Sequence, residues 1–249
     1  MDSLNVMSSS LALKRFYKEA TAEAQEEGFV VLLDGRIVKT PEQLPLLFPT
    51  MELAQAVADE WNAQGKEIDS TKMPMMTFTC TAIDWIGGER DEAVEGISAY
   101  GGHDLLCYWD DSMQDLQDLQ KEIWQPLLDW TALTFDAPLA ITSGLLSVDQ
   151  TESTLKALHN AVCTIPNMEL AALSSIVRIG GSLVVGLALL KGHIDVEKAH
   201  EAVLLHEIFQ HERWGADDEA EERHVNILTE FRTAMKFLSL IRVEHVTEH

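Results

Sequence analysis

The chain has 249 residues, of which 46% are hydrophobic and 24% are charged, a composition typical of ordinary globular proteins. A chain of this length forms one large domain or two small ones and buries enough surface for a real core. Its 41 acidic and 18 basic residues give a formal net charge of −23. This charge argues against nucleic acid or an anionic membrane as a partner, because both bind cationic surfaces. It favours solubility and, if anything, a basic partner.

The cysteines and the first residues indicate a reducing compartment. Cys80, Cys107 and Cys163 are an odd number, widely spaced and without a C-x-x-C pair, which fits buried thiols rather than a disulfide framework or a zinc site. Residues 1–13, which include Ser8, Ser9 and Ser10, are predicted to be a disordered tail. They lack the basic and apolar regions of a signal peptide and the arginines of a transit peptide. The sequence therefore predicts a cytoplasmic protein.

Residues 14–72 are predicted to form a small β-rich N-terminal domain. Residues 29–33 and 36–39 flank Asp34-Gly35, a pair that supplies the positive φ angles of a tight hairpin turn. A short strand is expected at residues 46–48. Thr50 has the position of an N-cap for a following helix, which should stop before Gly65.

Residues 73–249 are predicted to form a larger helical C-terminal domain, so the fold class is α+β. Apolar residues recur there at helical spacing, with one possible short strand at 139–141. The helices are expected at residues 75–86, 89–100, 112–135 with a kink at Pro126, 151–163, 168–190, 195–214 and 217–242.

The most apolar run is residues 168–190. A membrane-spanning helix needs about 20 apolar residues, and Glu169 and Arg178 interrupt this run. Gly180, Gly181 and Gly186 favour a buried central helix with close neighbours instead. No stable membrane insertion is therefore expected.

The stretch from Glu207 to Ala220 combines the end of one helix, the stop at Gly215 and the acidic start of the next helix. Glu207 is the unusual residue, because it follows Val203 by four positions and so lies within the apolar stripe of its helix. It is either paired inside the fold, with an Arg or a helix N-terminus, or directed at something outside it.

The charge around this stretch is strongly acidic. Residues 195–222 contain ten acids and two bases, which favours a role in recognition. Trp214 lies within this run and has the chemistry of an interface anchor. The alternative is that Trp214 packs between the last two helices.

Motifs that would indicate catalysis are missing from the sequence. His206 and His211 are five residues apart, so their directions on a helix differ by about 140°, whereas a zinc-protease helix needs a spacing of four. His200 and His211 stand about 16 Å apart along the helix, too far for one metal ion. There is no G-x-S-x-G or phosphate-binding G-x-x-x-x-G-K-S/T sequence. We expect no catalytic residue, metal or cofactor.

Several separated stretches of the chain form a recognisable set. These stretches are Arg15-Phe16-Tyr17-Lys18, Leu33-Asp34-Gly35-Arg36 with Lys39-Thr40-Pro41, Ala56-Val57-Ala58-Asp59-Glu60-Trp61, Met73-Pro74, Thr81-Ala82-Ile83-Asp84, Asp104-Leu105-Leu106-Cys107-Tyr108, Trp124 with Pro126-Leu127-Leu128-Asp129-Trp130, and Glu207 through Gln210 to Trp214-Gly215. Their order and spacing extend over nearly the whole chain. Together they resemble the ATP synthase assembly chaperones that attend the alpha subunit of the catalytic F(1) sector. Trp109 departs from the pattern, since the family is expected to carry Arg after Cys-Tyr.

The resemblance implies a β-rich N-terminal domain joined to a helical one, no catalysis, and a protein that keeps the unassembled alpha subunit soluble. It places the functionally important acid on Glu207, with Glu212 as the next candidate. The partner-binding residues expected on this basis are Glu207, Gln210, Trp214 and Asp217. Because the family is mitochondrial in eukaryotes and no transit peptide is visible, the resemblance implies a bacterial cytoplasmic member.

Two other functions remain open from the sequence. One is an enzyme on an acidic helical scaffold that uses Glu207, His206 or His211, which a polar pocket around these side chains would favour. The other is an interaction module with a different client.

Overall fold

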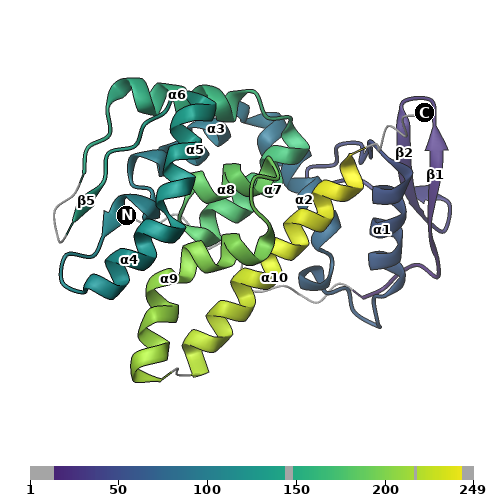
Figure 1. Ribbon diagram of the computed structural model, residues 1–249. Coiled ribbons are helices and arrows are strands. Elements are labelled where there is room, and N and C mark those ends of the chain that lie inside the picture. Colours follow the sequence, from purple (N-terminus) through teal and green to yellow (C-terminus); the bar gives the residue numbers. More distant parts are fainter. Residues whose placement is uncertain (1–13, 144–147, 216–217, 243–249) are drawn as a thin grey trace, which may run out of the picture. The chain divides into compact units, whose positions relative to one another are not determined.

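A computed structural model describes residues 14–143, 148–215 and 218–242 (Figure 1). The chain divides into two compact units, which we call the N-terminal unit (within residues 1–84 and 240–249) and the helical unit (residues 85–239). A small antiparallel sheet followed by helices confirms the α+β fold class. The domain boundary between residues 72 and 73 stays a prediction, and the tail at residues 1–13 lies outside the described residues.

The N-terminal unit contains a three-stranded antiparallel sheet. Its strands are β1 (Ala20–Gln25), β2 (Gly28–Leu33) and β3 (Arg36–Ile37), in that order across the sheet. The hairpin is confirmed: Leu33 pairs with Arg36, and Asp34 and Gly35 have φ angles of 46° and 80°. Residues 46–48 form only an isolated bridge, between Phe48 and Phe29, rather than the predicted strand.

One helix, α1 (Met51–Asn62), packs against β1 and β2 (Figure 1). Thr50 caps it as predicted, because its Oγ1 accepts a hydrogen bond from the backbone N–H of Leu53 at 3.2 Å. At the other end, the Tyr17 hydroxyl donates to the Trp61 carbonyl at 2.6 Å. The Asn62 amide accepts from the backbone of Ala20 and donates back to it, both at 2.8 Å. These bonds attach the sheet to the helix end.

The remaining elements are short helical turns, one small sheet and a series of helices. They are η1 (Ser70–Lys72), α2 (Pro74–Cys80), the π-helical turn η2 (Thr81–Ile86), α3 (Arg90–Ser98), η3 (Ala99–Gly102), η4 (Leu105–Cys107), β4 (Tyr108–Trp109), α4 (Gln114–Ile123), α5 (Gln125–Phe135), β5 (Thr142–Ser143), α6 (Glu152–Cys163), α7 (Asn167–Gly180), α8 (Leu183–Leu190), α9 (Val196–Trp214) and α10 (Asp218–Ile241). The strands β4 and β5 pair in parallel. The strand predicted at residues 139–141 is therefore present as β5, but it begins three residues later.

Two predicted long helices are wrong, because each is a pair of helices. Residues 112–135 divide at Trp124, and Pro126 lies in the first turn of α5, where its missing N–H leaves no helical hydrogen bond unmade. Residues 168–190 divide at Gly181, which has a φ of 69° and ends α7. Ser182 then caps α8 by accepting a hydrogen bond from Val185 N–H at 3.0 Å.

The core of the helical unit is built around α8, whose eight residues are all buried. Helices α5, α7 and α9 and the turn η3 pack against it. A helix that is apolar on every side requires neighbours on every side, so the predicted burial of this region is confirmed. Among the described residues, no helix is both long and apolar enough to span a membrane.

A fully buried carboxylate, that of Asp104, closes the N-terminus of α8. It accepts hydrogen bonds from Ser182 Oγ at 2.7 Å, Val184 N–H at 2.9 Å and Leu106 N–H at 3.1 Å. Burial raises the pKa of Asp104, while these hydrogen bonds act in the opposite direction. The carboxylate therefore connects η4 to α8 through groups that would otherwise be unsatisfied.

Gly186 permits the close approach of α7 and α8. A Cβ atom at this position would lie 2.7 Å from Val177 Cγ2 and 3.0 Å from Leu173 Cδ1. We expect Gly186→Ala to lower the free energy of unfolding by about 1–2 kcal/mol, because overpacking outweighs the gain in helix propensity. The change in the free energy of unfolding is measured by denaturant unfolding of the variant and the wild type.

The matched control is Gly96→Ala in α3, where a Cβ atom would meet nothing within 4 Å. This change should stabilise the protein by up to about 1 kcal/mol through helix propensity alone. Equal effects of the two substitutions would contradict the packing argument.

Candidate functional site

The predicted site residues Glu207, Gln210 and Trp214 lie on helix α9. This helix begins and ends where the sequence predicts. The Asp195 carboxylate accepts a hydrogen bond from Lys198 N–H at 2.8 Å, and Gly215 follows the last turn with a φ of 86°. The predicted stripe residues Ala199, Val203 and Leu204 are buried, and burial extends further around the helix to Ala202, Leu205 and Phe209. Glu207 follows Val203 and Leu204 at helical spacing but is itself only partly buried.

Glu207 is paired inside the fold with the start of α10. Its carboxylate accepts a hydrogen bond from Arg223 Nε at 3.1 Å, and its other oxygen lies 3.3 Å from His224 Nε2, outside the directional geometry of a hydrogen bond. One third of the Glu207 side chain remains exposed. Of the two interpretations of this acid, pairing with a nearby Arg is the one that the geometry supports.

Histidine rings fill the space beside this ion pair. His211 stacks on His224 with ring centroids 4.9 Å apart, and His200 Nε2 lies 3.0 Å from the His224 carbonyl oxygen. His206 points elsewhere, toward Gln120 and Trp124. The predicted divergence of His206 and His211 is therefore observed, and the described residues contain no cluster of His, Cys, Asp or Glu that could hold a metal ion.

His206 belongs to a half-buried polar network between α4 and α9. Gln120 accepts a hydrogen bond from Asp110 N–H at 2.9 Å through Oε1, and its amide nitrogen lies 2.7 Å from His206 Nε2. Because the amide nitrogen can only donate, His206 Nε2 must be an unprotonated acceptor. Burial lowers the pKa of His206, against the nearby charge of Asp110, which raises it.

The C-terminal end of α9 is open to solvent. Trp214 is 68% exposed, which contradicts the interpretation that it packs between the last two helices. Gln210 is also exposed, and with Glu207 and Trp214 it has the spacing of one helix face. The structure therefore brings three of the four predicted partner-binding residues together. The fourth, Asp217, lies outside the described residues.

Three neighbours of this site were not predicted from the sequence. Arg223 and His224 contact Glu207 from α10, and Asp115 at the start of α4 forms an ion pair with Arg213. The Arg213 guanidinium also lies 4.4 Å from the centre of the Phe209 ring. Opposite charges in the sequence suggest that ion pairs form, but they do not predict which residues of other helices lie close enough to pair.

A polar pocket around the histidines would have favoured an enzyme. Four surface cavities of between about 470 and 750 Å³ are lined by residues that include none of Glu207, His206 and His211. The space next to Glu207 is instead occupied by Arg223 and the histidine stack.

Comparison with known proteins identifies the family. The model of the ATP12 chaperone protein family matches residues 14–132. The crystal structure of Atp12 from Paracoccus denitrificans is 38% identical, with 92% of this chain and 99% of that chain covered and a TM-score of 0.86. A candidate chaperone from Agrobacterium tumefaciens is 34% identical, with 92% and 86% covered and a TM-score of 0.85. Mitochondrial atp12 of Schizosaccharomyces pombe is 26% identical, over 85% of this chain and 77% of that protein.

The chain therefore belongs to the ATP12 chaperone family, a family of ATP synthase assembly chaperones. It is a chaperone of F(1) assembly and not an enzyme, as the resemblance implied. The region around Glu207 and Trp214 lies beyond residues 14–132, the part matched by the family model.

His206 should make stability depend on pH. Because folding lowers its pKa, the unfolded chain binds this proton first as pH falls. The stabilisation is complete above the ordinary histidine pKa and decreases as pH falls below it. We expect the wild type to lose more stability between about pH 8 and pH 5 than His206→Gln, measured by urea unfolding at each pH. Identical pH dependence of the two proteins would contradict this.

Proposed function

We propose that this chaperone binds the unassembled alpha subunit of the F(1) sector and prevents its aggregation until assembly. The family membership supports a role in ATP synthase assembly. The observation that carries the proposed site is the exposure of Trp214 at the end of α9. We assign partner binding to Trp214 and Gln210, with Glu207, and keep Asp217 from the sequence prediction.

An exposed tryptophan is costly for a free protein and useful at an interface. It offers a large apolar area together with one hydrogen-bond donor, and such residues dominate the binding energy of many complexes. The last turn of α9 is held in place by contacts of Arg213 with Phe209 and Asp115. Because this turn is already ordered, little conformational entropy is lost when a client covers Trp214. The acids around it, including Glu212, would favour a basic patch on the client.

Glu207 has a different task in this proposal, because two neighbours already occupy its carboxylate. Its ion pair with Arg223 holds the first turns of α10 against α9. We infer that it positions the recognition surface and keeps one third of its side chain available to the client.

We also propose a cytoplasmic, bacterial location. Burial and the adjacent charge of Asp84 raise the pKa of the Cys80 thiol to about 12. Burial and the adjacent charge of Asp104 raise the pKa of the Cys107 thiol to about 12 as well. Thiols of this kind are unreactive and suit a reducing compartment. Cys163 is exposed, so the expected burial of all three cysteines is wrong for this residue. Fractionation of the source cells with an antibody against the chain tests this, and recovery from an exported fraction would refute it.

The first experiment dilutes purified alpha subunit from denaturant with and without the protein and follows light scattering, with chromatography to size any complex. We expect less aggregation and a co-eluting species, because an exposed anchor covers apolar client surface. Trp214→Ala should weaken the complex about tenfold. The control is Leu133→Ala, which removes another exposed side chain, 87% accessible, and should leave binding unchanged.

The outcomes separate three cases. Suppressed aggregation without a stable complex would indicate a general holdase rather than a specific chaperone. No effect on the alpha subunit would refute the proposed client. If Trp214→Ala and Leu133→Ala weaken binding of the alpha subunit equally, the proposed site is refuted, although the alpha subunit remains the proposed client.

A charge exchange tests the task assigned to Glu207. Glu207→Lys should weaken alpha-subunit binding, because it places like charges beside Arg223. The double variant Glu207→Arg with Arg223→Glu restores an ion pair with the charges reversed. If Glu207 only positions the surface, the double variant should regain most of the binding, as measured by titration calorimetry. If binding stays at the level of Glu207→Lys, the carboxylate itself contacts the client.

A further inference from the structure

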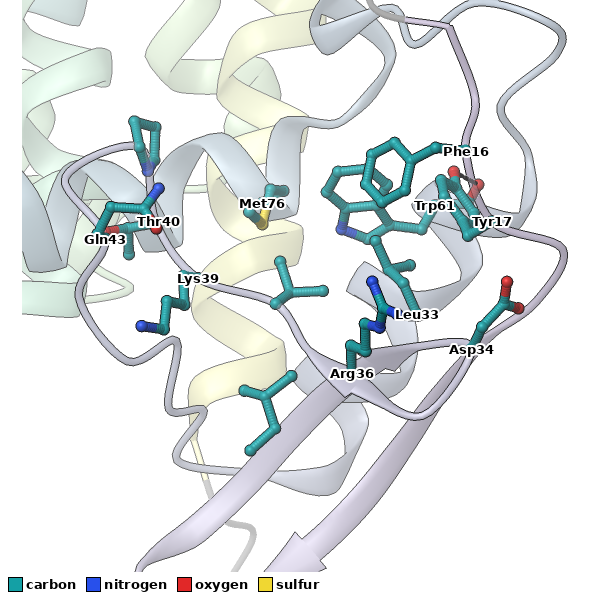
Figure 2. A pocket seen from close by; sticks show the side chains of 13 residues that line it. Phe16, Tyr17, Leu33, Asp34, Arg36, Lys39, Thr40, Gln43, Trp61 and Met76 are labelled. Atoms are coloured by element: carbon teal, nitrogen blue, oxygen red, sulfur yellow. Dashed lines mark hydrogen bonds between the residues drawn. The ribbon is translucent and has the colours of Figure 1, made fainter.

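The N-terminal unit contains a surface groove of about 750 Å³, shown in Figure 2. It is lined by the chain that precedes β1, the β2–β3 hairpin with the segment after it, and residues of α1 and α2. Its surface is mainly apolar, with contributions from Phe16, Leu33, Ile37, Trp61 and Met76. Every described element of this groove belongs to the N-terminal unit, so it is separate from the α9 surface.

Two bulky apolar side chains lie open at this groove. Phe16 is 69% exposed and Ile37 is 47% exposed. Phe16 packs edge-on against Tyr17 with ring centroids 5.5 Å apart, and Tyr17 packs in the same way against Trp61. These contacts hold Phe16 in place although most of its surface faces solvent. A fixed, exposed aromatic ring is a feature of binding surfaces.

The charges of the groove are opposite to those of the chain as a whole. Arg36 and Lys39 project from its rim (Figure 2), and neither forms an ion pair within residues 14–143, 148–215 and 218–242. The acid of the lining is Asp34, whose carboxylate accepts hydrogen bonds from the N–H groups of Lys18 and Glu19 at 3.1 Å. These bonds lower the pKa of Asp34.

The spacing of the cations indicates an extended ligand. The segment from Arg36 to Lys39 continues the strand, because Val38 N–H donates to Val31 at 2.9 Å and Lys39 bridges to Pro45. Three residues of extended chain span about 10 Å. Both side chains line the groove, so a ligand that lies along the groove would meet both, whereas a small anion would reach one.

We propose that this groove binds an extended protein segment that carries acidic side chains between bulky apolar ones. Phe16, Ile37 and the floor around Trp61 would contact the apolar side chains, and Arg36 and Lys39 the carboxylates. The inference rests on the proposed function, since we take the segment to belong to the alpha subunit. The protein would then hold its client by two surfaces of opposite charge, one acidic on α9 and one basic here.

The test uses short overlapping peptides that cover the alpha-subunit sequence, labelled with fluorescein and titrated with the full chain. We expect binding by peptides in which Asp or Glu adjoins Leu, Ile or Phe, weakened by added salt. The double variant Arg36→Glu with Lys39→Glu should weaken these peptides and the intact alpha subunit about tenfold. Ile37→Ser should weaken the same peptides without changing the charge.

The matched control is Lys14→Glu with Lys66→Glu, which makes the same change of charge in the same unit at two exposed lysines outside the groove. It should leave both affinities within about twofold of the wild type. Circular dichroism and thermal melting of each variant establish that it is folded.

Two results distinguish failure of the groove from failure of the client. If the groove variants bind the alpha subunit and its peptides like the wild type, the groove inference is wrong and the proposed function stands. If acidic peptides bind through the groove but the intact alpha subunit is not captured, the client is wrong and the groove assignment stands. Equal binding of peptides without acids would refute the role of Arg36 and Lys39.

Discussion

The helical unit depends on a carboxylate that is removed from water at the N-terminus of α8. Asp104 satisfies two backbone N–H groups and the hydroxyl of Ser182, and so ties the η4 turn to the most buried helix of the protein. Burying an acid is expensive unless each of its lone pairs is used, so its hydrogen bonds fix the geometry closely. Helices α5, α7 and α9 then pack around α8, and the orientation of α9 decides which of its residues face solvent.

That orientation gives α9 two different sides. One side contributes Ala202, Leu205 and Phe209 to the core, and the neighbouring side meets the start of α10 through Glu207 and the stacked histidines. Beyond these contacts the last turn continues into solvent and exposes Trp214. A chaperone needs such a surface, because it must cover apolar client area reversibly without burying its own anchor in the free state.

The proposed client would meet two surfaces of unlike chemistry. The α9 end is acidic, whereas the groove of the N-terminal unit combines Arg36 and Lys39 with exposed apolar side chains. A client that binds both surfaces must carry a basic patch and an acidic segment, a requirement that buried area alone would not impose. Binding at two places also raises the effective affinity when both are engaged.

The sequence by itself determined the features that arise from neighbouring residues: the hairpin at Asp34-Gly35, the caps at Thr50 and Asp195, the stop at Gly215, and the fold class. Strand β1 was missed because most of its residues are not buried and it shows no clear alternation. The divisions at Trp124 and Gly181 were missed because apolar spacing continues across them. Only the tertiary structure decided that Glu207 pairs with Arg223 and that Trp214 is exposed. These outcomes depend on how helices distant in sequence are rotated against each other, and that rotation follows from packing of the whole core.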